Sequence, residues 1–319
     1  MPIVDMSLEQ LKKYQGVNPR PDDFDEYWDK GLNEMHSLDP EVKLVPRKSE
    51  ANFVECFDLY FTGVGGARIH AKYMRPKKSP AKHPAVVMLH GYSGNGGEWV
   101  EKYGYVAQGF SFFALDCRGQ GGQSEDRGGV KGNTFHGHII RGLDDAPEKL
   151  LFRSIFLDCA QIAGIAMAMP EVDGARVGAF GGSQGGGLTL ACAALEPRIK
   201  RAAPLHPFLC DYKRVWDMDL AAGAYGELKT FFRVFDPLHL REKEIFTRLG
   251  YIDVQYLAPR IKAEILLGTG LMDTTCPPST QFAAYNKIRS KKHLSIYPDF
   301  GHEGLPGFSD ATFEFLCGL

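Results

Sequence analysis

A serine set among glycines is the residue of this sequence best suited to covalent chemistry. Ser183 follows an apolar stretch that ends at Phe180, and it precedes a helical stretch over residues 188–195. The run around it reads Gly181-Gly182-Ser183-Gln184-Gly185-Gly186-Gly187. A G-x-S-x-G pattern between a buried strand and a helix is typical of a nucleophilic serine on a sharp turn, where larger neighbours would collide with the strand or the helix. The pattern predicts a nucleophile at Ser183; the alternative is a glycine-rich turn with an incidental serine.

A serine nucleophile needs a base, and the order of the sequence offers one histidine in the expected place. Sites of this kind present the serine, then an acid, then the histidine along the chain. His302 follows the last apolar strand, and Asp273 follows the strand before it. Asp299 is the alternative acid because it lies so close to His302 in sequence. We predict Asp273 because it lies in a separate loop, from which it can reach the far nitrogen of the imidazole ring.

Two backbone N–H groups are expected to bind the oxyanion that forms when a serine attacks a carbonyl group. One is the N–H of Gln184, at the positive end of the predicted helix dipole. The other is the N–H of Tyr92, in the loop 91–97 that follows the strand ending at His90. The phenol of Tyr92 either lines the pocket or packs away from it.

The residues named so far fall where a parallel sheet would gather them. Short apolar runs alternate with helical stretches through much of the chain, which indicates an α/β protein with a mostly parallel sheet and helices on both faces. The predicted strands of this sheet are residues 85–90, 110–116, 176–180, 200–205, 263–268 and 293–297. Ligands bind beyond the carboxyl ends of parallel strands, and Ser183, Asp273 and His302 each follow such an end.

The N-terminal part of the chain precedes this alternation. Residues 53–60 and 68–74 predict an antiparallel hairpin that turns at Gly65-Gly66. Further upstream, Pro21 and the acidic residues after it predict the first turn of a helix with an apolar face.

One insertion interrupts the alternation, at about residues 208–258. It is aromatic and charged, and we expect it to form a helical cap over the active edge of the sheet rather than an ordinary excursion. Trp216, inside this insertion, either packs there or contacts substrate. Residues 1–319 are otherwise expected to form a single domain.

Composition and charge exclude several classes of partner. Lys and Arg number 37 against 39 Asp and Glu, so no basic excess is present to bind nucleic acid. No stretch approaches the ~18 uninterrupted apolar residues of a membrane span. The seven cysteines form no C-x-x-C pair, and the first residues do not resemble a secretory signal. We therefore expect reduced thiols and a cytoplasmic protein that binds neither nucleic acid nor membrane.

No metal or cofactor is expected either. His136-Gly137-His138 has no third ligand nearby, so it is a weak metal motif. The glycine run at 181–187 contains no lysine for a phosphate-binding loop and has no acidic partner at the dinucleotide distance.

Three motifs together resemble a known family of esterases. They are Arg118-Gly119-Gln120-Gly121, the serine run at 181–186, and His302-Glu303. This set is similar to carbohydrate esterase family seven, the acetyl xylan esterases and cephalosporin C deacetylases. Residues 21–28, 90–92 and 137–142 are also similar, so the resemblance covers nearly the whole chain.

The resemblance implies an α/β-hydrolase fold that removes acetyl groups from acetylated sugars and other small esters such as cephalosporin C. It also implies that no cofactor is used and that the chain assembles as a homo-oligomer, a ring-like hexamer. The predicted function is thus a serine acetyl esterase that works through an acetyl-enzyme. The alternatives are a peptidase or a longer-chain esterase and, from another class, a catalytically silent binding protein.

Overall fold

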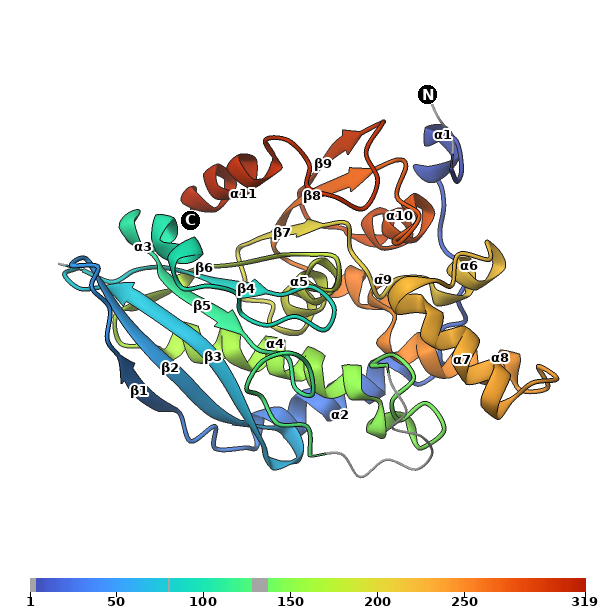
Figure 1. Cartoon of the computed structure of the whole chain (residues 1–319), viewed down its shortest axis with the longest axis horizontal. Coiled ribbons are helices and arrows are strands. Elements are labelled where there is room, and N and C mark those ends of the chain that lie inside the picture. Colours follow the sequence, from blue (N-terminus) through green and yellow to red (C-terminus); the bar gives the residue numbers. More distant parts are fainter. Residues whose placement is uncertain (1–3, 80, 128–136) are drawn as a thin grey trace.

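A single sheet forms the centre of the molecule, as Figure 1 shows. The computed structural model describes residues 4–79, 81–127 and 137–319. Over these residues, nine strands run in the order β1-β2-β3-β5-β4-β6-β7-β8-β9. Strands β1, β2, β3 and β5 pair antiparallel, whereas β5, β4, β6, β7, β8 and β9 pair parallel. The predicted mostly parallel sheet is confirmed.

Every predicted strand is present, together with one that the sequence pattern did not reveal. The strands are β1 Lys43–Arg47, β2 Val54–Gly63, β3 Ala67–Pro76, β4 His83–Leu89, β5 Ser111–Leu115, β6 Val172–Gly182, β7 Arg201–Leu205, β8 Glu264–Gly270 and β9 Lys292–Tyr297. The unpredicted strand is β1, a largely exposed edge strand. It buries too little apolar surface to produce an alternating pattern. The predicted hairpin is confirmed as β2 and β3, joined by the short helix η1 over Val64–Gly66.

Helices cover both faces of the sheet. Their bounds are α1 Leu8–Leu11, α2 Phe24–His36, α3 Tyr103–Ala107, α4 Leu151–Ala168, α5 Gln184–Leu195, α6 Tyr212–Asp217, α7 Gly226–Phe235, α8 Glu242–Leu249, α9 Val254–Leu257, α10 Pro278–Lys287 and α11 Phe308–Cys317. Successive residues of β4 show the two faces, because side chains alternate along a strand. Val87 belongs to the large apolar core with α4 and α5, whereas Val86 packs in a smaller core with α3 and α11.

Helix α2 begins later than the sequence suggested. The expected first turn included Pro21, but the helix begins at Phe24 with Asp23 before it. The Phe24 N–H instead donates to the Pro21 carbonyl oxygen at 3.3 Å, so Pro21 lies in a turn that precedes the helix. The apolar face is as expected, because Phe24, Tyr27 and Trp28 are all buried.

The insertion at 208–258 is helical and contains α6, α7, α8 and α9. In Figure 1, α6, α7 and α8 lie beyond the arrowheads of β4 and β7, at the carboxyl edge of the parallel strands. Trp216 packs inside the insertion against Phe232, His239 and Phe246, with ring centroids 4.7, 5.5 and 6.1 Å away.

Two further expectations concern membranes and thiols. Among the described residues, α4 is the one helix long and apolar enough to cross a membrane, but most of it is buried in the core of the protein. All seven cysteines are free, and all but Cys317 are buried. The cysteines therefore behave as small core side chains, as their spacing predicted.

Candidate active site

Ser183 lies on a strained turn between β6 and α5. Its backbone has φ 59° and ψ −120°, which a residue with a side chain rarely adopts. A side chain on Gly181 or Gly185 would collide with the carbonyl oxygen of Leu89 in β4. The turn therefore packs against the neighbouring strand so closely that glycine is required on both sides of the serine. This is the steric reason for the G-x-S-x-G pattern.

A chain of hydrogen bonds joins Ser183, His302 and Asp273. The Ser183 Oγ lies 2.9 Å from His302 Nε2, and His302 Nδ1 lies 2.9 Å from Asp273 Oδ2. A carboxylate can only accept a hydrogen bond, so Nδ1 carries the ring proton and Nε2 is free to accept the hydrogen of the serine. The structure thus brings together the three residues that the sequence order selected. Asp299, the alternative acid, is exposed, and the His302 ring bonds to Asp273 instead.

Asp273 is fully buried and held by its own loop. The N–H groups of Thr275 and Cys276 donate to its Oδ1 at 2.9 and 2.7 Å. These two donors fix the orientation of the carboxylate and leave Oδ2 to accept the hydrogen of His302 Nδ1. The loop after β8 therefore presents the carboxylate to the far side of the His302 ring.

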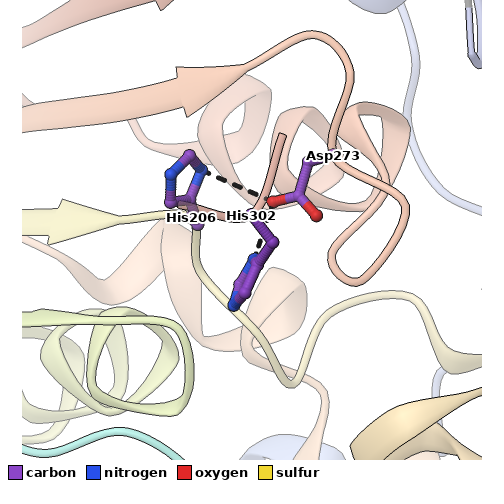
Figure 2. Close-up of side chains that lie close together, drawn as sticks. All are labelled: His206, Asp273 and His302. Atoms are coloured by element: carbon purple, nitrogen blue, oxygen red, sulfur yellow. Dashed lines mark hydrogen bonds and ion pairs between the residues drawn. The ribbon is translucent and has the colours of Figure 1, made fainter. Parts of the chain in front are cut away.

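His206 is a second histidine beside this carboxylate, and it is not among the site residues predicted from the sequence. Its Nδ1 lies 3.4 Å from Asp273 Oδ2, and Figure 2 shows both histidine rings reaching the same carboxylate. Its Nε2 donates to the carbonyl oxygen of Glu303 at 3.0 Å. The signal that could have found it is its position, directly after the predicted strand 200–205 at the carboxyl edge of the sheet.

Gln184 and Gln120 fasten the two expected oxyanion donors to each other. Gln184 is the first residue of α5, so its backbone N–H has no partner within the helix. Its buried side-chain amide pairs reciprocally with the amide of Gln120, at 2.9 and 3.0 Å. The Gln120 Oε1 also accepts the N–H of Ser93 at 3.0 Å. Gln120 therefore connects the serine turn to the loop that contains Tyr92.

His90 fixes the start of the Tyr92 loop, residues 91–97, through two hydrogen bonds of its ring. Its Nδ1 lies 2.7 Å from the carbonyl oxygen of Gly91, and its Nε2 lies 2.9 Å from the N–H of Cys117. A carbonyl oxygen accepts and a backbone N–H donates, so the ring is neutral with its proton on Nδ1. Burial lowers the pKa of His90, which favours the same neutral form.

The phenol of Tyr92 packs between His138 and Phe208, the first residue of the insertion. Its hydroxyl oxygen accepts the N–H of His138 at 3.2 Å, and its ring centroid lies 5.8 Å from that of Phe208. The His138 Nε2 lies 2.9 Å from the Ser93 hydroxyl oxygen. Of the weak histidine motif noted above, His136 lies outside the described residues.

Arg118, the first residue of the motif at 118–121, is a buried structural anchor. Its guanidinium forms a bidentate ion pair with Asp158 of α4, with N–O distances of 2.7 and 2.6 Å. The same guanidinium donates to the carbonyl oxygen of Val64 at 3.0 Å. The motif therefore contributes one residue to the frame of the fold and another, Gln120, to the site.

The fold and the site together define the class of protein. A serine on a strand-to-helix turn, with a histidine and an aspartate on loops after later parallel strands, is the arrangement of a serine hydrolase in an α/β-hydrolase fold. The model of the acetyl xylan esterase family matches residues 1–319. The chain therefore belongs to the acetyl xylan esterase family, which confirms the resemblance drawn from its motifs.

Solved structures and a curated relative agree with this membership. Acetyl xylan esterase 1 from Thermoanaerobacterium sp. JW/SL YS485 is 60% identical, with a TM-score of 0.97 over 98% of this chain and 99% of that one. The acetyl xylan esterase from Paenibacillus sp. R4 is 37% identical, with a TM-score of 0.93 over the same shares of the two chains. Acetyl esterase Axe7A from Xylanibacter ruminicola is 28% identical over 92% of this chain, which spans only 66% of that longer protein.

Proposed function

We propose that this protein hydrolyses acetyl esters of small carbohydrates, with acetylated xylo-oligosaccharides as the natural class of substrate. The observation that carries the proposal is the continuous relay from Ser183 through His302 to Asp273, in a chain of the acetyl xylan esterase family. Each contact in the relay has the distance and the donor direction that proton transfer from a serine requires.

The proposed reaction proceeds in two halves. In the first, His302 Nε2 takes the hydroxyl proton while Ser183 Oγ attacks the acetyl carbonyl carbon. The N–H groups of Tyr92 and Gln184 bind the oxyanion, and one such donor typically contributes about 3 kcal/mol. The bond to the alcohol oxygen then breaks, and the alcohol leaves with the proton from His302.

In the second half, water replaces the alcohol. His302 takes a proton from the water, which attacks the acetyl-serine, and the same two N–H groups bind the second oxyanion. Acetate leaves, and Ser183 regains its proton. Asp273 stays ionised throughout; it keeps the His302 proton on Nδ1 and stabilises the imidazolium that forms in each half.

Other substrates and classes are alternatives to this proposal. Cephalosporin C has an acetate ester of the same chemistry, so we include it as a second substrate. A longer-chain esterase would use the same relay with a deeper acyl pocket. A catalytically silent binding protein is disfavoured because all members of the relay are present and in contact.

The test is hydrolysis of nitrophenyl esters of rising acyl length, from acetate to octanoate, followed by acetylated xylo-oligosaccharides and cephalosporin C. We expect kcat/KM to be highest for acetate and to fall steeply with acyl length. A preference for butyrate or longer would replace the deacetylase proposal with a general esterase. No activity on any ester would leave the binding protein as the better function.

Variants of the relay test the mechanism. Ser183→Ala should lower kcat by at least about 10⁴-fold while the circular dichroism spectrum stays that of the native protein. Asp273→Asn should lower kcat by about 10³–10⁴-fold, because the His302 tautomer is no longer held. Asp299→Asn is the matched control, the same chemical change on an exposed carboxylate, and it should leave kcat unchanged. Equal losses in the two aspartate variants would refute the role of Asp273.

A further inference from the structure

Three metal-ligating side chains meet at the carboxyl edge of the sheet. They are His206 after β7, Asp273 after β8 and His302 after β9, and one ligand atom of each lies within 4.8 Å of the others. Figure 2 shows the two rings on the same carboxylate. Two imidazoles and one carboxylate are a common donor set for zinc in proteins.

The His206 ring presents a lone pair to Asp273, not a proton. The Glu303 carbonyl oxygen that its Nε2 contacts can only accept, so Nε2 carries the hydrogen of the neutral ring. Among the described residues, its buried Nδ1 finds no hydrogen-bond partner and faces Asp273 Oδ2 instead. A lone pair beside a carboxylate oxygen is repulsive unless a cation lies between them.

The spacing of these atoms fits a tetrahedral metal ion. Metal–nitrogen and metal–oxygen bonds of about 2.1 Å at a tetrahedral angle place two ligand atoms about 3.4 Å apart. The separation between His206 Nδ1 and Asp273 Oδ2 is 3.4 Å. The three ligand atoms lie within 4.8 Å of one another, so the His302 ring would need to move to complete the set. Its side chain has room to do so, because it is 25% exposed, whereas Asp273 is fully buried.

We propose that His206, Asp273 and His302 form an inhibitory site for Zn²⁺ and similar borderline divalent cations. The metal would bind His302 through Nδ1, which must lose its hydrogen. The neutral ring then carries a hydrogen on Nε2, so no net proton is released. Nε2 can donate to Ser183 but cannot accept its proton, and the nucleophile is no longer activated. The loss of activity rests on the proposed function, whereas the binding itself does not.

The first experiment measures binding without activity. The Ser183→Ala variant of residues 1–319 keeps all three ligands and is titrated with Zn²⁺ by calorimetry. We expect one Zn²⁺ per chain, and Co²⁺ at the same site should give the intense visible absorption of tetrahedral cobalt. Mg²⁺, which prefers oxygen ligands, should not bind. An octahedral cobalt spectrum would overturn the proposal. This test needs no substitution of a ligand, so it does not depend on whether such a variant folds.

The second experiment removes one ligand. His206→Gln, added to Ser183→Ala, keeps an N–H for the Glu303 carbonyl and should weaken Zn²⁺ binding by at least about tenfold. The matched control is His138→Gln, a half-buried histidine outside the set, which should bind Zn²⁺ as before. Binding that survives His206→Gln but is lost in Cys276→Ser would assign the metal to the neighbouring thiol and overturn the proposal.

The third experiment tests inhibition in the protein with Ser183 intact. Zn²⁺ should inhibit nitrophenyl acetate hydrolysis, and a chelator should restore it. In the His206→Gln variant, the inhibitory concentration should rise by the same factor as the dissociation constant. Tight Zn²⁺ binding without inhibition would overturn the inhibitory role. Absence of esterase activity in the metal-free protein would instead refute the proposed function.

Discussion

Gln120 is the side chain on which the two halves of the proposed oxyanion hole depend. Its amide pairs with that of Gln184 and accepts the N–H of Ser93, so it spans the distance between the serine turn and the Tyr92 loop. The Gln184 amide is fully buried, and a buried amide that loses its partner is destabilised by about 1–3 kcal/mol. Without the Gln120 side chain, the Tyr92 loop loses the hydrogen bonds that hold it against the serine turn.

We therefore expect Gln120→Ala to lower kcat by up to about 100-fold, because small displacements of positioning groups have effects of that size. KM should change little, since the donors act mainly on the transition state. Steady-state kinetics on nitrophenyl acetate checks this. Gln123→Ala is the control, because that exposed side chain accepts a hydrogen bond from the Tyr60 hydroxyl and belongs to neither the serine turn nor the Tyr92 loop. An unchanged kcat in Gln120→Ala would show that the loop is held by other contacts.

At the scale of elements, helix α7 of the insertion is fastened to the loop around residue 139 by one buried carboxylate. Glu227 Oε2 accepts the N–H groups of Ile139 and Ile140 at 2.7 and 3.2 Å. In the described part of the chain, its buried Oε1 has no hydrogen-bond partner. Burial raises the pKa of Glu227 from its ordinary 4.5 to about 7, against the smaller opposite effect of those N–H groups.

This pKa predicts how stability changes with pH. Between about pH 4.5 and 7 the folded protein holds a proton on Glu227 that the unfolded chain has lost. The stabilisation from that proton is complete below pH 4.5 and is lost as the pH rises through 7. The full difference is about 3 kcal/mol.

Glu227→Gln removes this titration. The Tm of the variant relative to the natural protein should therefore rise between pH 5 and pH 8 by an amount that corresponds to ~3 kcal/mol. Thermal unfolding followed by circular dichroism across this range measures it. A difference in Tm that does not vary with pH would contradict the raised pKa.

At the scale of the molecule, one buried ion pair joins three parts of the fold. Arg118 follows β5, Asp158 lies in α4, and the guanidinium also binds the Val64 carbonyl at the β2–β3 turn. Both charged side chains are almost completely buried. Removing one partner of such a pair leaves the other charge buried and uncompensated.

The cytoplasmic location and the hexameric assembly are also properties of the whole molecule, and both stay predictions.

Asp158→Asn should lower the free energy of unfolding by about 3–5 kcal/mol, because Arg118 keeps its charge without a counterion. Urea denaturation measures the change. Asp173→Asn breaks the solvated pair with Arg176 by the same substitution and should leave stability nearly unchanged. If the two variants were equally stable, the ion pair would not be a determinant of the fold.

The position of the nucleophile and the order of its partners could be predicted from the sequence, because each depends on local constraints. The glycines around Ser183 follow from the lack of space beside Leu89, and long apolar runs mark strands buried on both faces. Edge strand β1 escaped prediction because an exposed strand needs no apolar pattern. The bounds of α2 were displaced because a proline suits a preceding turn as well as a first helical turn.

Sequence order alone determined the strand-to-helix turn, the parallel sheet and the loops that bear Asp273 and His302. Only the tertiary structure decided that His302 bonds to Asp273 and not to Asp299, that Gln120 pairs with Gln184, and that His206 shares the carboxylate. The physical reason is that spacing along a chain sets which loop a residue occupies. The direction of a side chain depends instead on how separate loops pack, and that packing joins residues far apart in sequence.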